Sequence, residues 1–198
     1  GGLAKYFYLA KGEKGLVEII TTAKVLNLPF FILGGGSNLL INDEGFDGLV
    51  IRIQIDHLKS ADNRILVGAG LSLGQLVKDA TALSLSGLEW ATGIPGTVGG
   101  GIYGNCGAFG HSLSESVMSV KTLNPDKLEI KTHTNKQCDF GYRHSVFKTN
   151  SEIILEVELK LLAGEPQKIK ELVNQIVESR KKIPSYPSAG SVFKNIEV

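Results

Sequence analysis

The feature that most constrains this chain is a glycine-rich stretch at residues 93–110, GIPGTVGGGIYGNCGAFG. Eight of its eighteen residues are glycine, and few of the others are large. Glycine loses more backbone entropy on folding than any other residue, so a stretch of this kind is costly in a packed core. What glycine offers in return is a backbone that can approach a ligand closely. We therefore expect residues 93–110 to form one wall of a ligand site.

A second glycine cluster, GGGSN, occupies residues 34–38 and follows the short apolar run at residues 30–33. Consecutive backbone N–H groups in such a loop point into one concavity and form an anion-binding nest, to which Ser37 and Asn38 add side-chain donors. The cluster is neither a Walker A loop nor a Rossmann fingerprint, because the required spacings are absent. Since about 60 residues separate the two clusters, we expect one extended, phosphate-bearing ligand to lie between them.

The longer stretch also carries the signals of a helix start. Pro95 fixes one backbone φ angle, and Thr97 is a suitable N-cap for a short helix over residues 98–104. We expect the N–H groups at that helix start to be free for a diphosphate. The glycines inside the helix would let a flat ring or another backbone pack closely against it: Gly99, Gly100, Gly101 and Gly104.

Hydrophobic periodicity predicts an α+β fold. Strands are expected at residues 4–10, 30–33, 49–53, 64–67, 117–123, 129–133 and 153–162. Helices are expected at residues 13–26, from the capping-box pair Ser72 and Gln75 to about residue 85, and at 166–182; residues 39–41 are either a helical turn or a short strand. We divide the chain into a βαβ-β unit (1–53), an α+β unit with an antiparallel sheet (54–163) and the beginning of a third domain (164–198).

Composition excludes several classes of function. The chain has 198 residues and a net charge of +1, so bulk electrostatics favours neither a nucleic acid nor a membrane as a partner. Its apolar runs are too short to span a bilayer. Cys106 and Cys138 fit neither a disulfide framework nor a zinc spacing, so we expect two reduced thiols in a cytoplasmic protein. The four histidines show no metal-ligand spacing, and we expect no metal site.

Five motifs occur in order along the chain: residues 34–38 (GGGSN), 93–100 (GIPGTVGG), 105–110 (NCGAFG), 142–148 (YRHSVFK) and 188–195 (SAGSVFKN). Together they closely resemble the UDP-N-acetylenolpyruvoylglucosamine reductase family. The first two also occur in the wider group of FAD-binding oxidoreductases that resemble p-cresol methylhydroxylase, whereas the last two point to the reductases. The resemblance implies the two-subdomain FAD-binding fold of that group, followed by the start of a substrate-binding domain.

The resemblance also implies a reaction. Hydride would pass from NADPH to flavin N5 of FAD, and from there to the enolpyruvyl ether of UDP-N-acetylglucosamine, giving UDP-N-acetylmuramate for peptidoglycan synthesis. The partners implied are NADPH and the enolpyruvyl ether, with no nucleic acid and no membrane, and we expect a cytoplasmic monomer.

Roles for individual residues follow from the same resemblance. Ser191 matches the proton donor, and Arg143 matches the arginine that holds the substrate carboxylate and stabilises the enolate. Tyr142, Lys182 and Asn195 match substrate-binding positions. Tyr103 either packs in the core or lies near the flavin. The matched FAD-binding positions are Gly34, Gly35, Gly36, Ser37, Asn38, Gly93, Ile94, Pro95, Gly96, Thr97, Gly99, Gly100, Asn105, Gly107 and Ala108.

The chain departs from the family pattern in two ways. It resembles a reductase of the shorter subgroup cut short at both ends, so no residue matches the family glutamate that acts with the serine. Ile196 also replaces the usual proline after Asn195. Two other interpretations therefore stay open: another FAD-linked oxidase or dehydrogenase on the same fold, or an inactive fragment that binds a nucleotide or nothing.

Overall fold

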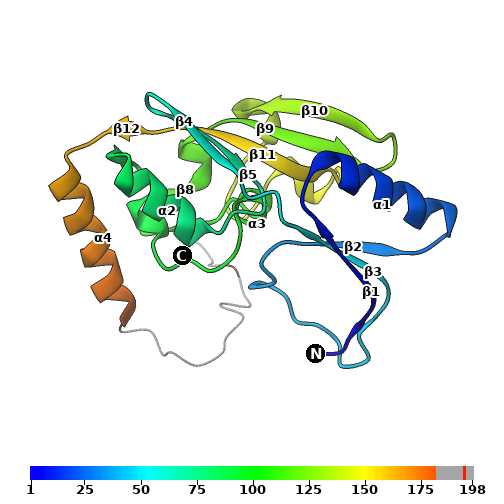
Figure 1. Cartoon of the computed structure of the whole chain (residues 1–198). Helices are drawn as coiled ribbons and strands as arrows, with labels where there is room; N and C mark the ends of the chain where they lie inside the picture. Colours follow the sequence, from blue (N-terminus) through cyan, green and yellow to red (C-terminus); the bar gives the residue numbers. More distant parts are fainter. Residues whose placement is uncertain (182–193, 195–198) are drawn as a thin grey trace.

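The computed structural model describes residues 1–181 and residue 194. In this part of the chain, a three-stranded parallel sheet and a five-stranded antiparallel sheet lie side by side, with helices packed against both (Figure 1). The predicted α+β class is confirmed. None of the described helices is long and apolar enough to cross a membrane.

The parallel sheet has the order β1–β3–β2 and contains β1 (Ala4–Ala10), β3 (Phe46–Ile53) and β2 (Phe30–Leu33). Both pairings are parallel, so the carboxyl ends of all three strands meet at one edge. Leu33 at the end of β2 pairs in register with Arg52 on β3. The Gly34–Asn38 loop therefore leaves the sheet at the edge where open α/β sheets usually bind ligands.

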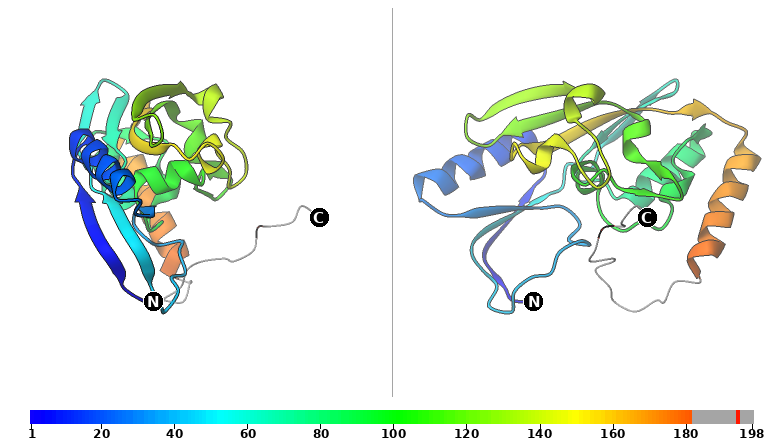
Figure 2. Two further views of the ribbon diagram at one scale, coloured as in Figure 1. Left: turned by 90° about the vertical axis from the view of Figure 1, so that its right-hand side faces the viewer. Right: turned by 180° about the vertical axis from the view of Figure 1, so that it is seen from behind.

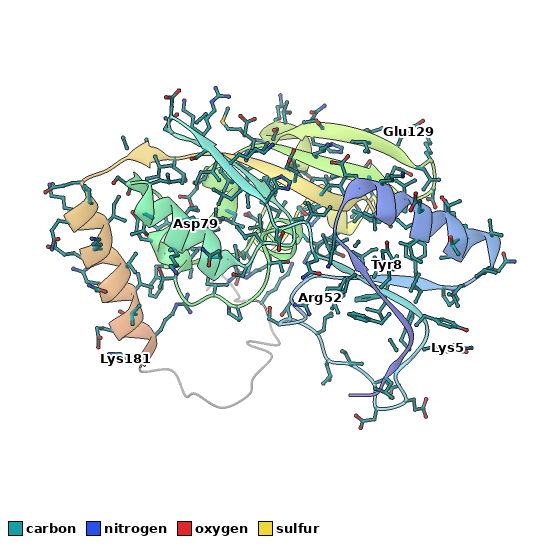
Figure 3. The ribbon with its side chains drawn as sticks, viewed as in Figure 1. Lys5, Tyr8, Arg52, Asp79, Glu129 and Lys181 are labelled. Carbon is teal, nitrogen blue, oxygen red and sulfur yellow. The ribbon has the colours of Figure 1, made fainter. Side chains whose placement is uncertain are left out.

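Helix α1 (Glu13–Val25) packs on one face of this sheet. Its buried side chains recur at helical spacing, as predicted: Leu16, Ile20 and Ala23. Tyr8 on β1 reaches this helix (Figure 3), where a Cβ atom added at Gly15 would lie 2.8 Å from the tyrosine hydroxyl oxygen. Glu13 Oε1 also forms an ion pair with Lys121 Nζ at 2.6 Å, so α1 connects the two sheets.

The second sheet is antiparallel throughout, as predicted, with the order β10–β9–β11–β5–β4. Its strands are β10 (Glu129–Thr134), β9 (Val117–Asn124), β11 (Ile153–Lys160), β5 (Arg64–Gly68) and β4 (Leu58–Ala61). Along β11, Val157 and Leu159 are buried, whereas Glu156 and Glu158 stay partly exposed. Strand β4 was not predicted, because three of its four residues are exposed and carry no apolar alternation.

The remaining helices lie below this sheet and at its end (Figures 1 and 2). They are α2 (Leu73–Ala82), α3 (Val98–Tyr103) and α4 (Pro166–Lys181), the last ending at Lys181 (Figure 3). Two short strand pairs join the loops: β6 (Leu85–Ser86) with β12 (Leu162–Ala163), and β7 (Gly107–Ala108) with β8 (His111–Ser112). Single 3₁₀ turns are η1 (Glu89–Ala91), η2 (Leu113–Glu115), η3 (Asn135–Cys138) and η4 (Val146–Lys148).

Two local predictions were wrong. The second helix ends at Ala82 rather than near residue 85, because Ser84 adopts a positive φ of 57° and Leu85 pairs in β6. Residues 39–41 form neither a helical turn nor a strand; all three are exposed.

The capping box predicted at Ser72 forms only in part. The Ser72 hydroxyl accepts from the Gln75 N–H, as expected. The Gln75 side chain instead donates to Asp79 one turn later, at 2.7 Å. The N-cap alone is sufficient to begin α2 at the predicted residue.

Buried side chains from both sheets and from α1, α2 and α3 form one continuous hydrophobic cluster. Its members include Ile51 from the parallel sheet, Val157 from the antiparallel sheet and Ile102 from α3. Burial of this kind contributes about 25 cal/mol per Å² of apolar surface. The shared core fixes α3, and the glycine-rich stretch around it, against both sheets.

Candidate functional site

The structure brings the two glycine clusters into direct contact. A Cβ atom added at Gly34 would lie 2.7 Å from Thr97 Oγ1, and one added at Gly35 would lie 2.8 Å from Gly96 Cα. The Ser37 hydroxyl donates to the Pro95 carbonyl oxygen at 3.2 Å. Because any side chain would separate the two backbones, this junction requires glycine at positions 34 and 35.

The junction presents backbone N–H groups without partners. Within residues 1–181 and 194, no hydrogen bond is donated by the N–H groups of Gly35, Gly36, Ser37, Asn38, Gly96 or Thr97. Gly36 has a φ of 72°, in the left-handed region that turns successive N–H groups into one concavity. These unpaired groups are the candidate donors for the anion nest expected at the early loop, with two further candidate donors from the later one.

Arg52 adds a positive charge at the same edge of the parallel sheet. It is exposed, pairs in register with both Leu9 and Leu33, and forms no ion pair with any described residue. Leu33 immediately precedes the nest. Nothing in the sequence pattern singled out Arg52, because a strand arginine normally indicates only a solvated position.

The start of α3 differs from expectation. Thr97 is the N-cap, as predicted, and its Oγ1 accepts from the Gly100 N–H at 3.3 Å. The Val98 and Gly99 N–H groups, however, donate to the Leu71 and Ala69 carbonyl oxygens, both at 2.8 Å. The expectation of free N–H groups at this helix start was therefore wrong, because the connection before α2 uses them. The free donors belong to the preceding loop.

Gly99 has a packing reason for lacking a side chain. It is buried, and an added Cβ atom would lie 2.8 Å from Ala69 Cβ. Gly100 is exposed on the opposite side. With their N–H groups already bonded, these two glycines allow close approach to α3 and donate nothing to a ligand.

A second cluster of polar groups surrounds the tip of a tight turn at residues 141–144. Gly141 and His144 exchange two backbone hydrogen bonds of 3.1 Å each, which places Tyr142 and Arg143 at the tip. Arg143 has a φ of 53°, and its guanidinium donates to the Gly107 carbonyl oxygen at 2.9 Å. The guanidinium also lies 5.2 Å from the centroid of the Tyr142 ring. Arg143 is thus held against the segment at residues 105–108.

Residues at the C-terminal end of α3 support this turn. Lys148 Nζ donates to the Arg143 carbonyl oxygen at 2.8 Å and lies 5.7 Å from the Tyr103 ring centroid. Fully buried Ser145 donates to the Tyr103 carbonyl oxygen at 2.7 Å. Tyr103 itself is 47% exposed, so it is not a core aromatic. Because α3 has six residues and rises about 1.5 Å per residue, the nest and the Arg143 cluster are about 9 Å apart along its axis.

Arg180 near the end of α4 also contacts the glycine-rich stretch. Its guanidinium lies 5.6 Å from the Phe109 ring centroid, and a Cβ atom added at Gly93 would lie 2.7 Å from its Cδ. Its Nε is buried and has no hydrogen-bond partner among the described residues. Arg180 was not predicted as a site residue. The only indication of such a role in the sequence is its position two residues before Lys182.

The other predicted positions are placed as follows. Ile94 is partly buried against the core, and Ala108 pairs with His111 in the short β7–β8 ladder. Ser191, Lys182 and Asn195 lie outside the described residues.

A cavity of about 690 Å³ lies between η1, Phe109 and α4, with Trp90, Leu172 and Ile176 among its walls. It does not include the junction of the two glycine clusters. Among the described residues, no group of three or more histidine, cysteine, aspartate or glutamate side chains is placed to hold a metal ion.

Both cysteines are free thiols. Burial raises the pKa of Cys106 to about 11, although the positive charge of Arg143 opposes this shift. Burial alone raises the pKa of Cys138 to about 11, and Cys138 is 0% exposed.

These pKa values predict the chemistry of Cys106. Because only the thiolate is nucleophilic, alkylation of Cys106 by iodoacetamide in the folded protein should be slow at pH 8 and should rise about tenfold per pH unit until the pH reaches the thiol pKa near 11. Cys138, being inaccessible, should remain unmodified. Mass spectrometry of alkylated peptides measures both rates, and rapid modification of Cys106 at pH 8 would contradict the burial described.

Comparison with known proteins gives the class first. The sequence pattern of the family described as FAD binding domain matches residues 4–131, which include the nest, Arg52, α3 and the segment at residues 105–108. Because this match covers well over half of the chain, the chain belongs to the FAD-binding domain class.

Individual relatives narrow the class. The chain is 39% identical to the UDP-N-acetylenolpyruvoylglucosamine reductase of Solibacter usitatus, over 98% of this chain and 63% of that protein. It is 37% identical to the reductase of Lactobacillus helveticus, over 98% of this chain and 66% of that protein. The crystal structure of the Thermus caldophilus reductase (MurB) superimposes with a TM-score of 0.81 at 30% identity, covering 96% of this chain and 68% of that one. The chain belongs to the UDP-N-acetylenolpyruvoylglucosamine reductase family, and spans about two thirds of the length of the curated relatives it matches.

Proposed function

We propose that this protein binds FAD and uses it to reduce the enolpyruvyl ether of UDP-N-acetylglucosamine with NADPH, giving UDP-N-acetylmuramate for peptidoglycan synthesis in the cytoplasm. The observation that carries the proposal is the junction of the two glycine clusters, whose six free N–H groups lie in a chain 39% identical to such a reductase. We further propose that the protein acts as a monomer.

The residues present fit FAD. The diphosphate would accept from the N–H groups of the nest at residues 35–38 and from Gly96 and Thr97, with Arg52 supplying a positive charge nearby. Because Gly34 and Gly35 have no side chains, the two loops lie close enough together to bind one diphosphate jointly. The opposite end of α3, with residues 105–108, is left for the ring.

Bound FAD would supply hydride transfer between a nicotinamide and the vinyl carbon of the enol ether. Arg143 would hold the substrate carboxylate, because a guanidinium is charged at every physiological pH and can donate to both carboxylate oxygens. One of its terminal nitrogens is already engaged by the Gly107 carbonyl oxygen, so the fork has a defined orientation before substrate binds. A preorganised donor of this kind stabilises developing negative charge by about 3–4 kcal/mol.

Ser191 would give the proton that completes the reduction. Lys182 and Asn195 would bind the UDP-sugar, together with Tyr142 beside Arg143. These three roles and that of Ser191 rest on the motif resemblance. A serine is a weak acid, so its proton would leave only toward the strongly basic enolate that Arg143 holds in place.

The proposal is tested by reconstitution. The purified protein is mixed with FAD, freed of unbound cofactor and placed under anaerobic conditions, and NADPH is added while flavin absorbance is followed. We expect a yellow protein whose flavin absorbance is bleached by NADPH. A colourless protein after reconstitution, or a flavin that NADPH leaves oxidised, would contradict the proposed function.

A further inference from the structure

We propose that Asn105 is a positioning residue that clamps the Tyr142–Arg143 turn, and does not contact the cofactor through its amide. The inference rests on the proposed function, because it concerns the arginine assigned there to the substrate carboxylate. It revises the role that the motif resemblance implies for Asn105.

The Asn105 side chain is committed within the protein. It is 6% exposed, so water does not compete for its amide. Its Nδ2 donates to the Gly141 carbonyl oxygen at 2.9 Å, and its Oδ1 accepts from the Ser114 N–H at 3.1 Å. Breaking either bond would leave a buried polar group unpaired, which costs about 1–3 kcal/mol. The amide therefore joins three chain segments, and at 6% exposure it presents little surface to a ligand.

The bond to Gly141 acts at the base of the turn that presents Arg143. Gly141 and His144 close this turn, and Arg143 at its tip donates back to Gly107, two residues after Asn105. Ser145 provides a third link, from the other side of the turn to Tyr103. Residues 103–107 thus hold the turn at its base, at its tip and just beyond it.

The backbone of Asn105 suits this role as well. Its φ is 43°, in the left-handed region that asparagine, aspartate and glycine tolerate better than other residues. This allows two substitutions that leave the backbone unstrained. Asn105→Gly removes both side-chain bonds, whereas Asn105→Asp keeps an acceptor for Ser114 and replaces the donor to Gly141 with a repelling carboxylate oxygen.

The chain offers a matched control in Asn27, which also has a positive φ of 50° but is exposed and makes no side-chain hydrogen bond with the described residues. Its side chain lies after α1, in the βαβ-β half of the chain. Asn27→Gly therefore reports the effect of an asparagine-to-glycine change in the left-handed region without any effect on the turn.

The experiment compares these variants in the FAD-loaded protein, one step at a time. The Asn105→Gly and Asn105→Asp variants should bind FAD, and NADPH should bleach their flavin at rates within about threefold of the wild type. Reoxidation of the flavin by the enolpyruvyl ether, in contrast, should slow by about 10- to 100-fold. A displacement near 1 Å of a positioning group can cost up to about that factor. Asn27→Gly should leave every step unchanged.

A second readout does not depend on activity. In the apoprotein, Asn105→Gly should speed alkylation of the adjacent Cys106 by about tenfold if the clamp is released, since thiol access follows local opening. If Asn105 acted only on global stability, all steps would slow together in proportion to unfolding. If it bound the cofactor, FAD affinity would fall first. Either pattern, or unchanged reoxidation in both variants, overturns the inference about Asn105. If instead the flavin of the wild type is not bleached by NADPH or not reoxidised by the enolpyruvyl ether, the proposed function is overturned.

Discussion

Replacing Gly35 with alanine is expected to weaken FAD binding by at least about 100-fold, the factor that corresponds to losing two charge-assisted hydrogen bonds of about 1.5 kcal/mol each. An alanine Cβ would lie 2.8 Å from Gly96 Cα and 3.4 Å from the Thr97 nitrogen, both backbone atoms that cannot rotate away. The loops would have to separate, and the added methyl group would cover a donor of the nest. Titration of the apoprotein with FAD, followed by quenching of flavin fluorescence, measures the change.

Gly74→Ala is the matched control for this prediction. Gly74 lies in α2, and a Cβ atom added there would meet nothing within 4 Å. Because alanine favours a helix over glycine by about 0.8–1 kcal/mol, this variant should melt at a slightly higher temperature and bind FAD as the wild type does. Equal losses of FAD affinity in both variants would show that the junction of the two glycine clusters is not the binding site.

Replacing Arg143 is expected to have the second large effect. Arg143→Ala removes both the charge proposed to hold the substrate carboxylate and the bond to the Gly107 carbonyl oxygen. Reoxidation of the flavin by the enolpyruvyl ether should slow by about 100- to 1,000-fold, as when one preorganised donor is lost from an active site. Arg143→Lys should recover little of this rate, because an ammonium group cannot reproduce a bidentate fork. Stopped-flow absorbance under anaerobic conditions measures the step.

The control for Arg143 is Arg64, a half-exposed arginine on β5 that pairs with Glu158 at 3.0 Å. Arg64→Ala removes one positive charge of the same kind from the surface, where a single ion pair contributes about 0–1 kcal/mol. It should leave both half-reactions unchanged. An equal slowing in the two variants would assign the effect to net charge and not to the position of Arg143.

The sequence was sufficient for the parts of the fold that depend on local pattern. Residues 4–10 and 30–33 were predicted as strands with the observed bounds, because each is a short, aromatic or wholly apolar run. Residues 166–181 formed the predicted helix, which Pro166 begins. Strand β4 could not be predicted this way, since its pairing with β5 fixes it and its own residues carry little apolar signal.

The same distinction applies to the candidate site, where local composition was informative and contacts between distant segments were not foreseen. Glycine content indicated that two loops approach a ligand, and the structure places them in contact. Which N–H groups remain free could not be read from the sequence, because the Val98 and Gly99 donors are taken by carbonyl groups some 25–30 residues earlier in the chain. For the same reason Arg180 and the bonds of Asn105 were not foreseen, since both depend on contacts between distant segments.

We propose that this chain carries the flavin of a reductase for an enolpyruvyl ether. A single experiment on the whole reaction begins with the FAD-loaded protein bleached by one equivalent of NADPH in the absence of oxygen. The enolpyruvyl ether of UDP-N-acetylglucosamine is then added while flavin absorbance is recorded. We expect the yellow absorbance to return and UDP-N-acetylmuramate to form in equal amount. A flavin that stays bleached until air is admitted would contradict it and would favour an oxidase on the same fold.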